Sequence, residues 1–192
     1  NGQTLATSFS EDGDKADWVK LVNSGLNSLK TYAKETSSQF DLDEISGLVL
    51  AAGRTGKKIM VHANGRLPVK LALEAGCHSI EHGFFMGKEN LQLMAEKEVV
   101  WVPTVYTMKG YAENFNPQKS DGDLRVINRT LEHQLEQMSI AREQGVTLAL
   151  GTDAGSLGVL HGESMVEEMK LYKKAGFSIS EIVRCATYNG AK

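Results

Sequence analysis

Three residues that can bind a metal ion stand where short apolar segments of this chain end. They are His62, His82 and Asp153. Each segment follows a helix-like stretch, as strands do in parallel α/β folds, where reactive groups collect at the carboxyl ends of the strands. Neutral imidazoles and a carboxylate suit Zn²⁺ or a similar divalent cation. The pattern is therefore typical of a metallohydrolase built on parallel strands.

The same residues also allow a purely structural interpretation. A single histidine in a strand is more often hydrogen-bonded within the core than bound to a metal. A lysine at a strand end, such as Lys30, is usually solvated, because lysine is seldom buried. Two histidines at equivalent strand ends, with an aspartate at a third, leave both interpretations open on spacing alone.

Alternation of side chains along a strand decides which residues share a face. His62 shares a face with Met60, and His82 shares one with Ile80. In a closed barrel, four polar side chains could all point inward near the top. They are Lys30, His62, His82 and Asp153.

A second histidine pattern in this region has a different explanation. Residues 78–82 read His-Ser-Ile-Glu-His, which matches the zinc peptidase pattern His-x-x-Glu-His. That pattern binds zinc only on a helix, and Gly76 and Gly83 bound the segment too closely for a useful helix. We therefore interpret His78 as structural.

Two further residues are candidates for substrate binding. His161 lies in the glycine-rich loop after Asp153, where it could orient a substrate or be an exposed loop histidine. Tyr106 could line the mouth of a pocket or pack locally. His133 falls outside the apolar stripe of its predicted helix, so we expect it to be solvated.

Apolar segments alternate with helical patterns along the chain. The predicted strands are residues 27–33, 57–63, 77–81, 99–105 and 146–152, and the predicted helices are residues 15–22, 41–53, 67–75, 88–97, 121–144, 163–175 and 180–187. The segments 1–14 and 106–120 are predicted loops. Nearly continuous apolar strands between helices favour a parallel sheet covered by helices. The sheet could be open and doubly wound, or part of a TIM barrel, which needs eight strands.

Composition excludes several classes of partner. The length of 192 residues predicts one domain, and the net charge of -3 does not favour nucleic acid as a binding partner.

No apolar run approaches the roughly 18 residues of a membrane span. The two cysteines, Cys77 and Cys185, are expected to be buried thiols. The N-terminus lacks a signal-peptide pattern and a starting Met, so the compartment stays open, with the cytoplasm favoured over export.

Several motifs together resemble one family. They are Val-His-Ala-Asn-Gly at 61–65, Glu-Ala-Gly-Cys-His-Ser-Ile-Glu-His-Gly at 74–83, Gly-Thr-Asp-Ala-Gly at 151–155 and Ala-Thr-Tyr-Asn-Gly-Ala at 186–191. In this order and spacing the chain, from about residue 28 onward, resembles the imidazolonepropionase- and prolidase-like branch of the amidohydrolase superfamily. The resemblance implies an α/β fold, a (β/α)₈ TIM barrel that binds one or two divalent metal ions, most often zinc.

The resemblance also implies roles for individual residues. His62 and His82 become metal ligands from the fifth and sixth strands of the barrel. Asp153, at the end of the eighth strand, becomes a metal ligand and the general base. Lys30 aligns with a fourth-strand lysine that some members carboxylate to bridge two metals, a reaction that needs a neutral amine.

The departures from the family pattern lead to further expectations. The sequence contains no His-x-His, the family's first-strand motif, and Asn64 stands where this branch often has a second histidine. The predicted strands match the fourth to eighth, so residues 1–192 are expected to be the C-terminal part of a longer barrel enzyme and inactive alone. That enzyme would hydrolyse an amide or cyclic amide C–N bond of a small molecule, including a dipeptide. The alternative is a non-catalytic fragment or interaction domain without a complete site. Open sheet edges predict homo-oligomers or self-association.

Overall fold

A computed structural model describes residues 16–118 and 122–191 of the chain. Within these residues the strands form one four-stranded parallel sheet in the order β1-β2-β3-β4. The strands are β1 (Trp18–Val22), β2 (Lys58–Ala63), β3 (Ser79–His82) and β4 (Val100–Val102). The order of strands in space follows their order in the chain, as it does in consecutive units of a TIM barrel.

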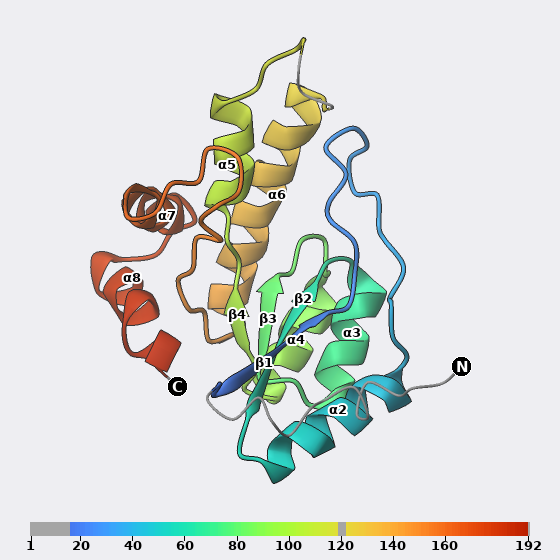
Figure 1. Cartoon of the computed structure of the whole chain (residues 1–192). Helices are drawn as coiled ribbons and strands as arrows, with labels where there is room; N and C mark the ends of the chain where they lie inside the picture. The colour runs from blue at the N-terminus through green and yellow to red at the C-terminus, as the bar shows by residue number, and fades with distance from the viewer. Residues whose placement is uncertain (1–15, 119–121, 192) are drawn as a thin grey trace.

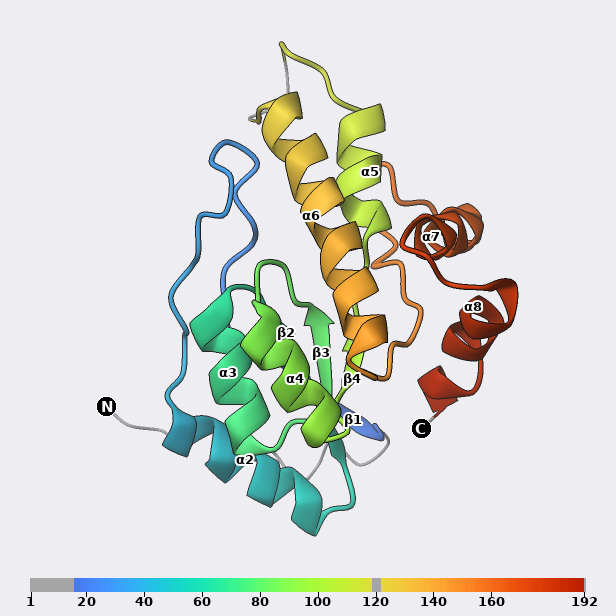
Figure 2. The ribbon, with the colours of Figure 1, turned by 180° about the vertical axis from the view of Figure 1, so that it is seen from behind.

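Helices α2, α3 and α4 join consecutive strands and pack on one face of the sheet, and four further α-helices follow β4 within the described residues. The helices are α2 (Leu42–Arg54), α3 (Arg66–Ala75), α4 (Lys88–Glu96), α5 (Tyr106–Glu113), α6 (Leu124–Glu143), α7 (Glu163–Lys174) and α8 (Ile179–Ala186). Helices α2, α3 and α4 lie behind the sheet in Figure 1 and in front of it in Figure 2. The chain is thus a parallel α/β segment of barrel type, with one helix-covered face and one face without these helices.

The register of the strands explains which side chains the helices bury. Leu21, Val61, Ile80 and Trp101 lie in one row across the sheet and are almost fully buried. The row of Val22, His62, Glu81 and Val102 points to the other face. In a closed barrel this second face would be the interior.

The first strand lies earlier in the chain than predicted. Residues 18–22 form β1, paired in parallel with β2, where a helix was predicted; Lys15 lies outside the described residues. The strand predicted over residues 27–33 is wrong, because Ser28 starts a local turn. Its hydroxyl accepts hydrogen bonds from the amides of Lys30 and Thr31, at 3.3 and 3.0 Å. Such turns compete with strand pairing.

A second correction concerns the segment after β4. Residues 106–120 were predicted to be a loop, but Tyr106–Glu113 form the helix α5. The N-cap residue Val105 makes no side-chain cap, and the carboxylate of Glu168 in α7 accepts the first two amides instead. A cap from 63 residues away leaves no local signal in the sequence.

The last predicted strand, over residues 146–152, pairs with β4 only through an isolated parallel bridge between Trp101 and Leu148. Its outer edge is bonded by the C-terminal segment: the amide of Leu150 donates to Cys185 O at 3.0 Å, and Asn189 Nδ2 donates to Leu148 O at 2.7 Å. The expectation of open sheet edges is therefore wrong at this side of the sheet, where the C-terminal segment bonds the edge.

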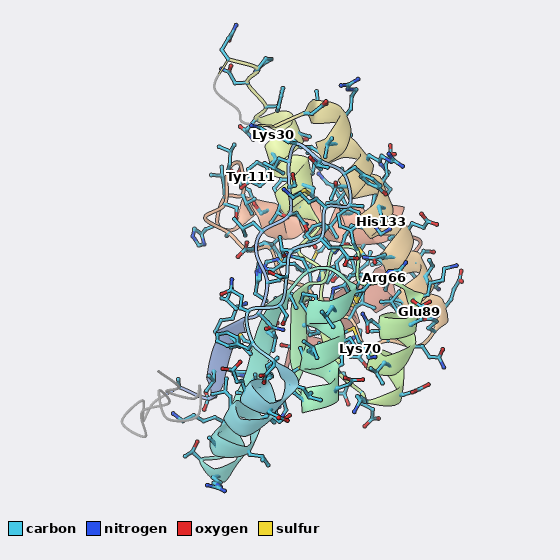
Figure 3. All side chains as sticks on the ribbon, turned by 90° about the vertical axis from the view of Figure 1, so that its right-hand side faces the viewer. Lys30, Arg66, Lys70, Glu89, Tyr111 and His133 are labelled. Carbon is cyan, nitrogen blue, oxygen red and sulfur yellow. The ribbon has the colours of Figure 1, made fainter. Side chains whose placement is uncertain are left out.

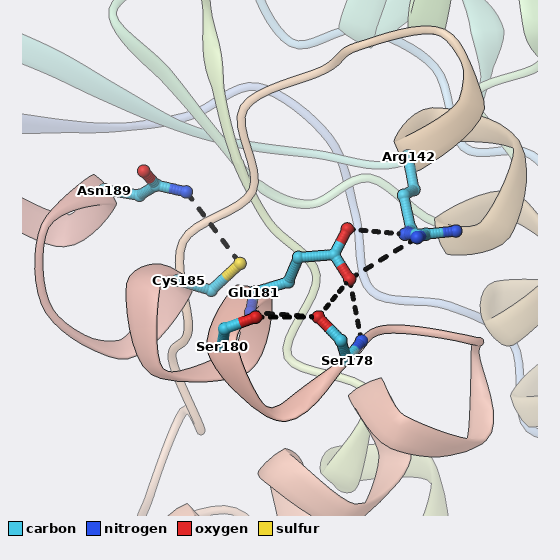
Figure 4. A network of polar contacts seen from close by, with 6 residues as sticks. All are labelled: Arg142, Ser178, Ser180, Glu181, Cys185 and Asn189. Atoms are coloured by element: carbon cyan, nitrogen blue, oxygen red, sulfur yellow. Dashed lines mark hydrogen bonds and ion pairs between the residues drawn. The ribbon is translucent and has the colours of Figure 1, made fainter.

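Helix α8 is held in place by a polar network at its start. Ser178 and Glu181 form a capping box, and the Glu181 carboxylate also pairs with Arg142 of α6 at 2.8 Å (Figure 4). Cys185 and Asn189 in the same figure belong to the segment that bonds the sheet edge. Both cysteines are buried free thiols, as predicted.

Candidate metal centre

A cavity of about 290 Å³ opens at the carboxyl ends of the strands. Its polar lining is Lys20, Asn27, His62, Asn64, His82, Thr107, Asp153 and Ser156, and its apolar lining includes Leu26, Leu29, Phe84, Met108 and Tyr111. The cavity therefore brings together three of the ligands proposed from the sequence, His62, His82 and Asp153.

His62 and His82 face each other closely, with ring centroids 4.6 Å apart and ring planes at 67°. Strict alternation would separate them, because His82 pairs with Ala63 while His62 pairs with Glu81. The backbone of His82, however, has φ +68°, in the left-handed region. This turn at the strand end directs the ring of His82 toward His62.

Left-handed backbone recurs at two further strand ends of the site. Thr104, after β4, has φ +46°, and Asp153 has φ +53°. Such conformations are uncommon for residues other than glycine, and most unusual for a β-branched residue such as Thr104. Backbone strain of this kind persists where surrounding structure enforces it, and it clusters at functional sites.

Each imidazole is oriented by its own hydrogen bonds. His82 Nδ1 lies 2.7 Å from the hydroxyl of Thr104, which leaves Nε2 for another partner. His62 Nε2 lies 3.4 Å from the carbonyl of Gly25 and 3.5 Å from Asn64 Nδ2. A metal-binding histidine is commonly held by such a bond to its second nitrogen, and the bond of His82 to Thr104 fits that arrangement.

Both imidazoles are held in the neutral form near pH 7. Burial lowers the pKa of His62, and it lowers the pKa of His82 to about 4, with the neighbouring His62 as the second cause. Neutral imidazole is the form that binds a metal ion. Burial also raises the pKa of Glu81, which shares the inward face and accepts a 2.7 Å hydrogen bond from Ser79.

Asp153 lies at the exposed rim of the cavity. Its carboxylate accepts a hydrogen bond from the Ser156 hydroxyl at 3.2 Å. Among the described residues, no three His, Cys, Asp or Glu side chains are grouped closely enough to hold a metal ion. The two facing imidazoles fit a divalent cation as a pair of ligands, and Asp153 lines the same cavity without completing a triad.

The lysine of the site is Lys20, not Lys30. Lys30 lies exposed in the turn after Ser28, outside the cavity, and Figure 3 shows it well beyond the strand ends. Lys20 is on β1, opposite Met60, and it lines the cavity with both histidines. The apolar run Trp-Val-Lys-Leu-Val was the signal that the helix prediction missed.

The two residues predicted to bind substrate lie outside the cavity lining. Tyr106 is buried in α5, where its hydroxyl bonds Glu113 and its ring lies under Lys109. His161 is exposed in the loop before α7. Tyr111, five residues after Tyr106 in the same helix, does line the cavity.

The remaining histidines lie away from the site. His78 Nδ1 accepts the Ile59 amide at 3.0 Å, and residues 79–82 form a strand, so the helical peptidase motif is absent from this segment. His133 is half-buried rather than solvated, with its ring 4.8 Å from that of Phe85.

Comparison with known proteins agrees with the fold. Residues 5–192 match the model of the Amidohydrolase family. The chain is 27% identical over 156 residues to an ochratoxinase from Aspergillus niger, a match that covers 79% of this chain and 31% of the ochratoxinase.

Two crystal structures extend the comparison. A Xaa-Pro dipeptidase with methionine bound in its active site superposes with a TM-score of 0.75 and 30% identity, over 94% of this chain and 44% of that chain. The ochratoxinase of A. niger superposes with a TM-score of 0.73 and 25% identity, over 91% of this chain and 38% of that chain.

The parallel strands, the helix-covered face and the histidine pair at the strand ends define a segment of an amidohydrolase-type barrel. The chain belongs to the Amidohydrolase family. It spans less than half the length of the ochratoxinase and the dipeptidase that it matches. No helix within the described residues is long and apolar enough to cross a membrane.

Proposed function

We propose that this chain forms part of a metal-dependent hydrolase that cleaves an amide or cyclic amide C–N bond of a small molecule. The observation that carries the proposal is the pair of imidazoles, His62 and His82, facing each other in a cavity at the strand ends. Membership of the Amidohydrolase family and the likeness to a dipeptidase support the same class of reaction.

Each polar residue of the cavity has a role in this proposal. His62 and His82 would bind the metal ion through their neutral nitrogens, with Zn²⁺ as the ion that this donor set favours. A bound divalent ion would supply Lewis acidity toward the substrate carbonyl and a water molecule. Asp153, at the rim, would accept a proton from the attacking water and pass it to the leaving nitrogen.

The number of metal ions depends on Lys20. Carboxylation of this lysine would add an anionic ligand on β1, beside the histidine pair, and allow a second ion. Lys30, which lies outside the cavity, does not serve this purpose in the proposal. The remaining ligands and barrel strands would come from a longer protein, of which residues 1–192 would be the C-terminal part.

The experiment uses the intact protein loaded with Zn²⁺ and the dipeptide Met-Pro as probe substrate. We expect His62→Ala to lose stoichiometric metal and activity together. Asp153→Asn should lower kcat by roughly 10²–10⁴-fold, the usual contribution of a general base. His78→Ala is the matched control, because His78 lies at the far end of its strand from the cavity and should retain both properties.

The rival proposal is an interaction domain that kept the fold without a complete site. It is favoured by the lack of a three-ligand cluster in the described residues. If the intact protein binds no divalent ion in stoichiometric amount, and its hydrolysis of several amides is unaffected by His62→Ala and Asp153→Asn, the hydrolase proposal is wrong and the rival stands.

A further inference from the structure

Glu168 is a fully buried carboxylate in α7, away from the cavity lining. Its side chain is 0% exposed, and its two oxygens accept separate backbone hydrogen bonds. Oε1 accepts the amide of Val105 at 2.9 Å, and Oε2 accepts the amide of Tyr106 at 2.6 Å. These are the two amides at the start of α5, where a negative charge also meets the positive end of the helix dipole.

The two amides follow directly after Thr104, the residue whose hydroxyl lies 2.7 Å from His82 Nδ1. Thr104 is buried and holds the left-handed backbone conformation. Its own carbonyl accepts the hydroxyl of Thr107 at 2.8 Å. A left-handed, β-branched residue relaxes unless its neighbours fix it. The bonds from Glu168 fix the residues on its C-terminal side.

Helix α7 also follows the loop that carries Asp153. The two hydrogen bonds that Glu168 accepts from the turn after β4 therefore connect the segment of Asp153 with the segment that orients His82. Glu167, the neighbouring acid, also links α7 with α5, through Lys109 at 2.7 Å, but on the partly exposed side and away from Thr104. The two glutamates thus offer a natural comparison.

We propose that Glu168 is a positioning residue, which holds the turn at residues 104–106 so that the Thr104 hydroxyl fixes the ring of His82 with Nε2 toward the cavity. The inference rests on the proposed function in one respect, that His82 is used as a ligand. The arrangement of the ring itself does not depend on that function.

The test is nuclear magnetic resonance of the intact protein labelled with ¹⁵N in its histidine rings, at pH 8. In the parent protein, the bond to Thr104 should hold His82 in one tautomer, with well-separated Nδ1 and Nε2 shifts. In Glu168→Gln, one oxygen becomes an amide group that cannot accept, so the turn loosens. The two His82 shifts should then move toward each other, and the amides of residues 105 and 106 should exchange about tenfold faster or more.

Three variants keep the result interpretable. Glu167→Gln, the control, should leave the His82 shifts unchanged. Thr104→Val removes the hydroxyl at nearly constant shape and shows the shift change expected for complete loss of the bond. If Glu168→Gln does not fold, Glu168→Asp, whose carboxylate is one methylene shorter, is measured in its place.

The outcome that overturns the proposal is faster exchange at residues 105 and 106 with parent-like His82 shifts, since Glu168 would then only cap α5. Zn²⁺ titration gives a second readout: weaker binding in Glu168→Gln but not in Glu167→Gln supports the proposal. If no variant or parent binds metal, the proposed function fails, but the ring shifts still decide the role of Glu168.

Discussion

The two faces of the sheet differ in what their side chains do. On the helix-covered face, Val61, Ile80 and Trp101 are completely buried. On the opposite face, Val22 is 49% exposed, and Lys20 is also exposed. Side chains of the first face pack in the hydrophobic core, and side chains of the second face line the candidate metal site.

This difference shows how the chain separates stability from function. The apolar side chains of the covered face are buried within the described residues, because helices α2, α3 and α4 supply their packing partners. The other face would be the interior of a barrel, and its polar residues, such as His62 and Glu81, are positioned by strand ends and hydrogen bonds rather than by a closed core. Substitutions on the two faces should therefore have different consequences.

The largest expected effect is on the covered face. Ile80→Ala should lower the free energy of unfolding by about 2–5 kcal/mol, because it removes buried methyl groups and leaves a cavity. Val22→Ala, on the open face at the end of β1, should cost less than about 1 kcal/mol, since half of the side chain already meets water. Urea unfolding of both variants measures the contrast. Equal losses would show that the open face is packed as tightly as the covered one.

The second effect is a pH dependence that comes from a buried acid. Burial raises the pKa of Glu168 to about 7 from an ordinary value of 4.5, against the two backbone hydrogen bonds that lower it. Below pH 4.5 the carboxyl is protonated in both states, whereas between pH 4.5 and 7 the unfolded chain ionises first. Stability should therefore fall across this interval, by up to about 3 kcal/mol.

Glu168→Gln should flatten this slope, because it removes the titrating group. Lys20→Gln is the control from the open face, because it changes a charged side chain there and leaves the buried Glu168 carboxyl in place. Chemical unfolding at a series of pH values provides the measurement. A slope that persists in Glu168→Gln would assign the pH dependence to another group.

The smallest effect concerns the outer edge of β1, which pairs with no other strand within residues 16–118 and 122–191. Pairing of this edge between copies would give self-association, and a charge placed there should oppose it. Val22→Lys is expected to weaken association several-fold, by about 1 kcal/mol at most. Leu50→Lys, at an exposed position of α2, is the control. Sedimentation at several concentrations measures the effect, and a parent chain that stays monomeric throughout would contradict the expectation.

Much of the fold could be predicted because its signals are local. Asp41 and Glu44 form the capping box at the start of α2, and left-handed Gly76 ends α3, close to the predicted boundaries. The missed elements lacked a cap or turn of this kind, and the apolar run at 18–22 was the one weak local signal for β1. Strand β1 is recognisable by its pairing with β2, and α5 is capped by Glu168 from a distant helix.

The candidate site likewise has features that follow from local sequence and features that depend on tertiary contacts. The sequence by itself determined the family, the parallel α/β class and the positions of His62, His82 and Asp153 at strand ends, because these follow from residue order and apolar pattern. Only the tertiary structure decided that Lys20 rather than Lys30 lines the cavity, and that a left-handed backbone turns His82 toward His62. Both depend on strand register and on contacts between distant residues, which no local pattern encodes.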